Sequence, residues 1–317
     1  MNPLEFLLTK RSVALLVHIN PDWDAYGSAL ALRAILRDRG VLCDIILEEA
    51  LPFHLNFLDT DVLTYDFCAE YDYDCVCAVD LSALNRLGKR TVIFENAPST
   101  ACIDHHIAPG EPISPVSRIV PEAAATAEVV YDLMCECSIP LTKTIADYLY
   151  CALSSDTGSF RFANTSLHSL GLFGEILKTG CDVANLANFL YFRSTYEAMK
   201  LKALAIDSIE LFEDGKIGIC AITNEMIERA GASREDASEF SDLPRTIASV
   251  EISAVLKESR VGLIKVSLRA KDKCNVEKIA ALFGGGGHVK AAGASIEGTV
   301  DEVKTLILPH LVKAVRE

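Results

Sequence analysis

The strongest constraint on the fold is a series of short apolar runs that alternate with amphipathic segments. The run SVALLV at 12–17 has the pattern of a buried strand, and SALALRAILRDRG at 28–40 that of an amphipathic helix that ends at Gly40. Further apolar runs and helical patterns follow in alternation, at 43–48, 73–81, 99–104, about 122–138 and 142–155. Strands that alternate with helices predict an α/β domain with a mostly parallel sheet.

Acidic and imidazole side chains follow the ends of these predicted strands. The stretch HINPDWDAYGS at 18–28 places one histidine and two aspartates directly after the first strand. Taken singly, each motif is also compatible with a helix cap or a solvated loop. Because ligands of parallel sheets bind at the carboxyl ends of the strands, we expect the side chains to converge there. The residues in question are His18, Asp22, Asp24, Asp80, Asp104, His105 and His106, with Asp156 in a Ser/Thr/Gly-rich turn after a helix.

Such a cluster of carboxylates needs compensating positive charge. Aspartate and histidine ligands without sulfur suit Mn²⁺, and also Mg²⁺, Fe²⁺ or Co²⁺, better than a structural zinc ion. The carboxylates are too many for one catalytic ion with three protein ligands, and they fit two ions about 3.5–4 Å apart. The sequence therefore predicts two divalent metal ions as cofactors, with Mn²⁺ as the first choice.

The character of the sequence changes after residue 188, which we predict to end the first domain. Residues 189–206 predict a linker helix, and residues 207–317 predict a smaller α+β domain. The elements expected there are a hairpin with its turn at Asp214–Gly215, a hairpin-like pair at 252–270, a helix at 275–283, a glycine-rich loop at 284–295 and a closing helix. Four consecutive glycines beside His288 favour a backbone cradle for an oxyanion over a simple hinge.

The motifs resemble those of the DHH phosphoesterase family, in the branch that carries the DHH-associated C-terminal domain. HINPDWDAYGS resembles the first family motif, VDLS at 79–82 the second, DHH at 104–106 the third and SDTGSF at 155–160 the fourth. GGGGHVKAAG at 284–293 resembles the C-terminal glycine-histidine motif. The five motifs stand in the family's order and span nearly the whole chain. Within the family the chain is most similar to the two-domain NrnA-type enzymes, which hydrolyse short oligoribonucleotides and 3′-phosphoadenosine 5′-phosphate (pAp).

The resemblance implies two sets of metal ligands and a set of catalytic residues. One ion would be held by His18, Asp22 and Asp80, and the other by Asp24, Asp80, His105 and Asp156, so that Asp80 bridges them. His106 would face the substrate phosphate as an electrostatic stabiliser or as the acid for the leaving group. Asp104 would orient a histidine, as metal-site imidazoles usually require. The expected catalytic residues are thus His106, Asp80 and Asp104.

The resemblance also implies substrate-binding positions, at Arg161, Arg269, Gly286, Gly287 and His288. Two residues of the first motif depart from the family pattern. Trp23 stands where many members have glycine, and Tyr26 stands where a smaller residue is usual. Either ring can wall the pocket or stack a nucleobase, or it can pack at the start of the helix.

The function implied by the resemblance is metal-dependent hydrolysis of phosphoester bonds. Expected substrates are short oligoribonucleotides such as pApA, cleaved to mononucleotides, and pAp, cleaved to AMP. Alternatives are a silent nucleotide-binding regulator, a family II-like inorganic pyrophosphatase, a RecJ-like exonuclease and an enzyme for the linear products of cyclic dinucleotides. The sequence is compatible with a homodimer.

Composition restricts the partners of the chain. The net charge is −14 and there is no dense run of Lys and Arg, so we expect short nucleotide ligands and no tracking along nucleic acid. No apolar run is long enough to cross a bilayer, and the first residues lack the features of a signal peptide. The 11 cysteines are scattered through apolar segments, as is usual for buried, reduced thiols. We therefore expect a cytoplasmic protein without a membrane partner.

Overall fold

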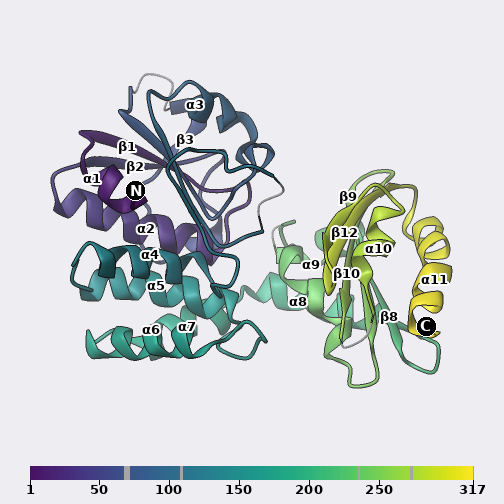
Figure 1. The fold of residues 1–317 in the computed structure, drawn as a ribbon. Coiled ribbons are helices and arrows are strands. Elements are labelled where there is room, and N and C mark those ends of the chain that lie inside the picture. The colour runs from purple at the N-terminus through teal and green to yellow at the C-terminus, as the bar shows by residue number, and fades with distance from the viewer. Residues whose placement is uncertain (68–71, 108–109, 235, 272–273, 317) are drawn as a thin grey trace. The chain divides into compact units, whose positions relative to one another are not determined.

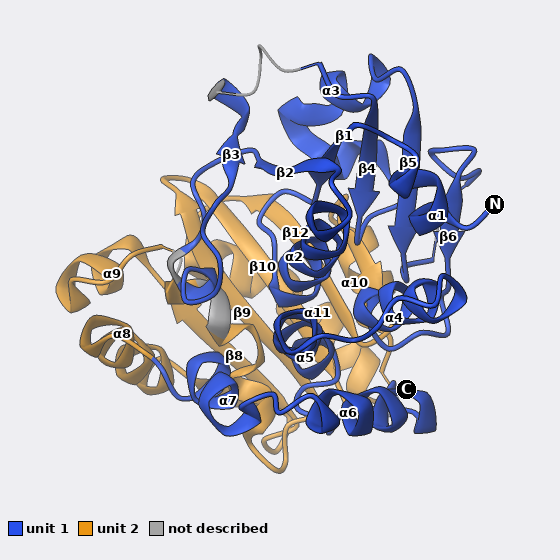
Figure 2. Ribbon diagram, turned by 90° about the vertical axis from the view of Figure 1, so that its left-hand side faces the viewer, with its two compact units in different colours: residues 1–193 blue, residues 194–317 orange. Residues whose placement is uncertain are grey.

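The structure is a computed structural model that describes residues 1–67, 72–107, 110–234, 236–271 and 274–316. The chain divides into two compact units, residues 1–193 and residues 194–317 (Figure 2). Unit 1 is an α/β structure with a parallel sheet, and unit 2 is an α+β structure with a mixed sheet. This confirms the predicted fold class. The domain limits drawn from the sequence at 188 and 206 stay a prediction.

Six parallel strands form the central sheet of unit 1, in the order β3-β2-β1-β4-β5-β6. Their bounds are β1 Ser12–Leu16, β2 Leu42–Leu47, β3 Leu63–Thr64, β4 Cys75–Val79, β5 Thr100–Asp104 and β6 Ser117–Ile119. The strand order reverses between β1 and β4, which is the position where parallel sheets open a crevice at their carboxyl edge. The loops that leave β1 and β4 therefore begin side by side.

Helices cover both faces of this sheet. Their bounds are α1 Pro3–Leu8, α2 Trp23–Asp38, α3 Thr91–Glu95, α4 Thr126–Glu136, α5 Lys143–Asp156, α6 Leu167–Lys178 and α7 Val183–Tyr191. Short 3₁₀ helices occupy Phe53–Leu55, Tyr65–Phe67 and Leu84–Arg90. Helices α2, α4 and α5 lie on one face and α3 on the other (Figure 1). Leu15 and Leu16 show the alternation, because the first belongs to the α2 side of the core and the second to the α3 side.

Unit 2 contains a six-stranded sheet in the order β11-β12-β10-β9-β8-β7. The strands are β7 Glu210–Phe212, β8 Ile217–Ile222, β9 Ile252–Arg260, β10 Leu263–Ala270, β11 Gly286–His288 and β12 Ala291–Glu297. The helices are α8 Tyr196–Asp207, α9 Asn224–Ala230, α10 Val276–Ala281 and α11 Val300–Arg316, with 3₁₀ helices η4 Asp236–Asp242 and η5 Pro244–Thr246. The predicted hairpins are confirmed as the antiparallel pairs β7–β8 and β9–β10.

The predicted glycine-rich loop is wrong in its secondary structure. Residues 286–288 form strand β11, which pairs with β12 in an antiparallel hairpin. A Cβ on Gly287 would lie 2.5 Å from the carbonyl oxygen of Ala291, and Gly287 has φ +142°. The glycines therefore permit a close approach between two strands, which a sequence pattern read for loops does not reveal.

The two faces of the unit 2 sheet are covered differently. One face packs against α10 and α11 through a cluster that includes Val266, Leu268 and Ile307. On the other face, Leu201 and Ala205 of α8 form a buried cluster with Cys220 of β8. Helix α8, which begins within the predicted linker, thus contributes to a core inside unit 2.

The structure also tests what the composition predicted about membrane-spanning segments and cysteines. Among the described residues, no helix is both long enough and apolar enough to span a membrane. The ten cysteines in the described part of the chain are free thiols, and most of them are buried. Burial raises the pKa of Cys43 and Cys102 to about 12, so these thiols stay protonated at neutral pH. They play no part in the acidic cluster described next.

Candidate metal centre

The side chains expected to converge lie together at the carboxyl edge of the unit 1 sheet. His18 Nε2 lies 3.6 Å from Asp22 Oδ2 and 3.5 Å from Asp80 Oδ2. His105 Nε2 lies 3.6 Å from Asp24 Oδ2, 3.6 Å from Asp80 Oδ1 and 3.3 Å from Asp156 Oδ2. They come from the loops after β1, β4 and β5, the first turn of α2 and the end of α5.

Asp80 lies between the two histidines and directs one carboxylate oxygen toward each. Its Oδ2 is the oxygen near His18, and its Oδ1 is the oxygen near His105. The backbone of Asp80 adopts φ +62°, in the left-handed region that costs a non-glycine residue about 1–3 kcal/mol. Its N–H donates to the carbonyl of Ile103 on the neighbouring strand at 2.9 Å. The turn after β4 is thus held in an uncommon conformation at the residue that both histidines share.

Backbone carbonyls orient both imidazole rings. Nδ1 of His18 lies 2.9 Å from the carbonyl of Ile19, and Nδ1 of His105 lies 3.1 Å from the carbonyl of Ala123. A carbonyl only accepts, so each Nδ1 carries the proton of the pair and Nε2 is left as the ligand atom. Within the described part of the chain, neither Nε2 has a hydrogen-bond partner, although both atoms are buried.

The crowding perturbs the titration of the cluster. Burial and the nearby charges of Asp80 and Asp156 raise the pKa of Asp24 well above its usual range. Burial alone would lower the pKa of each histidine. Attraction from the negatively charged carboxylates that face each Nε2 outweighs it, so that the pKa of His18 rises to about 9 and that of His105 to about 10. The raised pKa values of Asp24, His18 and His105 show that the cluster favours positive charge.

The donor set fits divalent cations. Two ligands of one ion, each about 2.1 Å from it, are roughly 3.0–3.4 Å apart, which is close to the spacings observed here. Three groups bring one ligand atom from each member within 4.8 Å of one another: His18, Asp22 and Asp80; Asp24, His105 and Asp156; and Asp80, His105 and His106. Buried Nε2 atoms without partners and carboxylates at these distances are the arrangement expected of residues that hold a metal. Asp80 contributes to two of the groups.

His106 has a different environment from the other two histidines. Its Nδ1 lies 2.8 Å from Oδ1 of Asp104, which also accepts the backbone N–H groups of His105 and His106. Burial would raise the pKa of Asp104, but the hydrogen bond and charge of His106 lower it below its usual range. Asp104 therefore stays ionised, and it holds the His106 ring through Nδ1. The pairing leaves Nε2 of His106 available to another group.

Comparison with known proteins agrees with this geometry. Residues 12–153 match the family described as "DHH family, N-terminal domain", and residues 216–316 match the "DHHA1 domain". The "bifunctional oligoribonuclease and PAP phosphatase NrnA" of Thermus thermophilus is 30% identical over 307 residues, which cover 96% of this chain and 89% of that protein. This chain belongs to the DHH family. The protein of the same name from Bacillus subtilis is 26% identical, over 88% of this chain and 87% of its own length.

Two solved structures share the fold of this chain. An exopolyphosphatase-related protein from Bacteroides fragilis superposes with a TM-score of 0.90 and 26% identity, over 98% of this chain and 96% of that one. The structure of RecJ from Thermus thermophilus in complex with Mn²⁺ has a TM-score of 0.57 and 14% identity. This superposition covers 99% of this chain and 54% of RecJ, and at this identity it shows only that the two proteins share a fold.

The expected substrate-binding residues of this DHH-family chain lie in both units. Arg161 belongs to unit 1, where it is exposed and its Nε donates to the carbonyl of Gly158 at 2.6 Å. The other four lie in unit 2, namely Arg269, Gly286, Gly287 and His288. Arg269 stands opposite Ala291, and Ala291 stands opposite His288. Directly opposed residues share a face, so Arg269 and His288 project from one face of the unit 2 sheet, two strands apart.

The two rings that depart from the family pattern are packing residues. Trp23 is 8% exposed, and its ring lies 4.7 Å from that of Phe57 between centroids. Tyr26 is fully buried, and its hydroxyl donates to the carbonyl of Asp59. Neither ring presents a free face for a nucleobase, so the packing alternative holds for both. Phe57 continues the contact by stacking on Phe189 of α7.

Residues at the start of α4 also contact the cluster, and they were not predicted from the sequence. The hydroxyl of Thr126 donates to Asp80 Oδ1 at 2.7 Å. The N–H groups of Thr126 and Ala127 donate to Asp24 Oδ2 and Oδ1 at 2.6 and 3.1 Å, and Ser28 Oγ donates to Asp24 Oδ1 at 3.2 Å. A threonine among alanines, in the run AAATAE, carries no local sign of a site. The helix predicted at about 122–138 places Thr126 beyond its first turn, whereas α4 begins at Thr126, so the sequence does not indicate that this N–H faces an acidic group.

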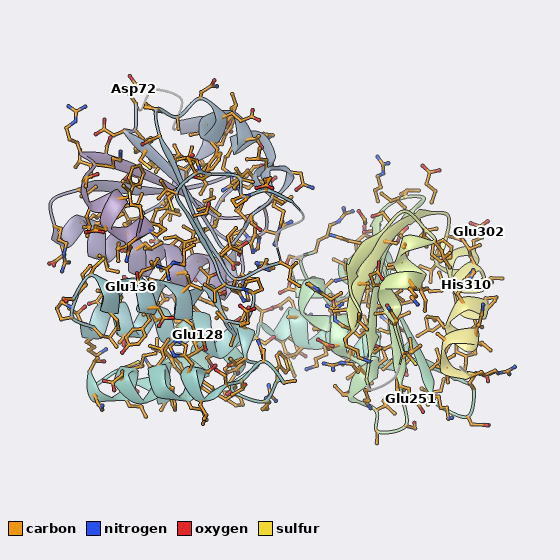
Figure 3. The ribbon with its side chains drawn as sticks, viewed as in Figure 1. Asp72, Glu128, Glu136, Glu251, Glu302 and His310 are labelled. Carbon is orange, nitrogen blue, oxygen red and sulfur yellow. The ribbon has the colours of Figure 1, made fainter. Side chains whose placement is uncertain are left out.

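Glu128 supports the same region from the first turn of α4. This buried carboxylate, marked in Figure 3, accepts the N–H of Ala124 at Oε2 and the hydroxyl of Ser169 at Oε1. It thereby fixes the segment before α4 that carries the carbonyl of Ala123. Because that carbonyl binds His105 Nδ1, the interaction of Glu128 also helps to orient a histidine of the centre.

Proposed function

We propose that this chain is a divalent-metal-dependent phosphoesterase that hydrolyses short oligoribonucleotides to mononucleotides and pAp to AMP. The observation that carries the proposal is the position of Asp80, whose two oxygens face two separate histidine–aspartate groups. The names of the relatives that match most of the chain supply the substrate classes. They favour this function over a silent nucleotide-binding regulator and over an inorganic pyrophosphatase.

The metal ligands are assigned as the family motifs imply. One ion would be held by His18, Asp22 and Asp80, and the other by Asp24, Asp80, His105 and Asp156. Mn²⁺ suits a mixed set of carboxylates and imidazoles and is our first choice. When bound, the ions would supply a water that is deprotonated near neutral pH, and they would neutralise charge that develops on phosphorus.

The protein's own groups would act on the substrate beside these ligands. His106 is partly exposed, and Asp104 engages its Nδ1, so Nε2 is the nitrogen that can meet the substrate. In the proposed reaction His106 holds a proton at Nε2 and delivers it to the leaving oxygen, or it stabilises negative charge on the phosphate. Asp104 keeps the ring in the orientation that this role requires.

The substrate would be anchored away from the reacting phosphate. Arg269, His288 and the backbone of Gly286 and Gly287 are proposed to bind a second phosphate or the 5′ end of a short nucleotide, with Arg161 as a further cation. Phosphate groups pair favourably with guanidinium and with backbone N–H groups. The net charge of −14 opposes binding of a long polyanion and is compatible with a short one held by a few placed groups.

Hydrolysis of pAp, pApA and a 5-mer RNA in the presence of Mn²⁺ tests the proposal. The Asp80→Ala variant is expected to lose activity while it retains the fold, and Asp38→Ala, at an exposed aspartate of α2, is the matched control. His288→Ala is expected mainly to raise KM. An Asp80→Ala protein that cleaves these substrates at the wild-type rate would rule out the shared role of Asp80. A wild type that cleaves only pyrophosphate would refute the proposed substrates.

A further inference from the structure

We infer that Thr126 is a positioning residue for the metal centre, which sets the rotation of the Asp80 carboxylate so that each metal group receives one of its oxygens. The inference rests on the proposed function, because it concerns the ligand that the two groups share. Thr126 touches no substrate in this scheme and acts through Asp80.

The contacts of Asp80 show why a positioning group is needed. A carboxylate rotates readily about its last torsion, because that torsion has broad minima. In Asp80 one oxygen must face His18 while the other faces His105, and the Thr126 hydroxyl donates to the oxygen on the His105 side at 2.7 Å. Asp80 is 1% exposed and Thr126 is fully buried, so water does not compete for this hydrogen bond.

The same helix terminus holds the neighbouring ligand Asp24. Its two oxygens accept the N–H groups of Thr126 and Ala127, at the positive end of the α4 dipole. Valine, serine or alanine at position 126 keeps this backbone N–H, so Asp24 stays anchored when the Thr126 side chain changes in these ways. The hydrogen bond from the Thr126 hydroxyl to Asp80 can be removed by a point substitution, which separates the role of this side chain from that of the helix itself.

The experiment measures binding of Mn²⁺ to metal-free protein by isothermal titration calorimetry. Thr126→Val keeps the shape of the side chain and removes the hydroxyl, and we expect its Mn²⁺ affinity to fall about 10–100-fold at one or both sites. Thr126→Ser keeps the hydroxyl and is expected to bind as the wild type does. Because Thr126→Ala and Thr126→Ser both lack the methyl group, their difference isolates the hydroxyl even if the valine variant does not fold.

Activity supplies a second readout. The Mn²⁺ concentration that gives half-maximal pAp hydrolysis should shift by the same factor in Thr126→Val, while KM for pAp at saturating Mn²⁺ stays at the wild-type value. A purely structural role would instead lower the melting temperature in EDTA without changing metal affinity. Equal Mn²⁺ affinities in the wild type and in the hydroxyl-free variants would overturn the inference alone. A wild type that binds no divalent ion would overturn the proposed function as well.

Discussion

Replacement of Gly27 by alanine tests whether close packing of two helices sets the distance between metal ligands. Gly27 lies in α2, and a Cβ at this position would sit 2.7 Å from the carbonyl oxygen of Tyr148 and 3.1 Å from Cβ of Ala152, both in α5. The carbonyl belongs to the helix backbone and cannot move alone. Asp24 lies one turn before Gly27 and Asp156 one turn after Ala152, so a change in helix separation reaches the centre.

The size of the effect follows from these distances. Ordinary contact begins at 3.4 Å, so α2 and α5 must separate by 0.7 Å (3.4 − 2.7) to admit the methyl group. Alanine gains about 1 kcal/mol over glycine in a helix, and overpacking of this kind costs about 1–3 kcal/mol. Since a misplacement of about 1 Å can lower a rate about 100-fold, we expect Gly27→Ala to lose roughly tenfold or more in kcat/KM.

Gly171→Ala is the matched control, because Gly171 is an exposed glycine inside α6 and its Cβ would meet nothing within 4 Å. Urea denaturation of the metal-free proteins should show the control more stable than Gly27→Ala by about 1–3 kcal/mol, since the helix propensity cancels in the comparison. Hydrolysis of pAp should fall only in Gly27→Ala. If both variants gained the same stability and kept full activity, contact between α2 and α5 would not set the geometry of the centre.

Two further predictions concern metal and pH. At 100 times its dissociation constant, Mn²⁺ should stabilise the protein by about 2.7 kcal/mol and raise the melting temperature by about 5–10 °C in scanning calorimetry, and an unchanged melting temperature would contradict the metal centre. In unit 2, burial and the charges of Lys265 and Arg269 lower the pKa of Lys257 to about 8 from 10.5. Protonation of this amine therefore destabilises the folded state. The destabilisation is full below pH 8 and disappears as the pH rises to 10.5, so the free energy of unfolding should increase over this range. Lys257→Met should reduce this increase in the free energy of unfolding by about 1–2 kcal/mol, after allowance for solvent screening. The pKa shift would be refuted if the free energy of unfolding changed equally in the variant and the wild type between pH 8 and pH 10.5.

The α/β organisation of unit 1 is readable from local sequence because its main strands are buried on both faces. Runs such as SVALLV and CVCAVD are then apolar throughout, and each ends abruptly in polar residues. The short strands β3 and β6 carry too few residues for such a pattern. Helices α6 and α7 were not predicted, although Leu172, Ile176 and Leu186 are buried in the core and Phe173, Val183 and Leu190 pack against it.

The candidate centre was foreseen to the extent that its residues follow strand ends. The convergence of His18, Asp80 and His105 follows from the topology of a parallel sheet, since their strands share one carboxyl edge. Thr126 and Ala123 were not foreseen, because a backbone carbonyl and a single hydroxyl leave no chemical signature in a sequence. Their role depends on where α4 begins in space.

The amino-acid sequence was enough to identify the carboxylates and imidazoles of the candidate centre, and to predict that most of them follow strands of one parallel sheet. Continuous apolar runs and the polar motifs that follow them are local properties of the chain, so they can be read without the fold. The tertiary structure decided which oxygen of Asp80 faces which histidine, that Trp23 and Tyr26 are packing residues, and that α4 supports the centre. Those outcomes depend on contacts between residues as far apart as Asp24 and Thr126, and pairings at such separation are set by the packing of whole helices and strands.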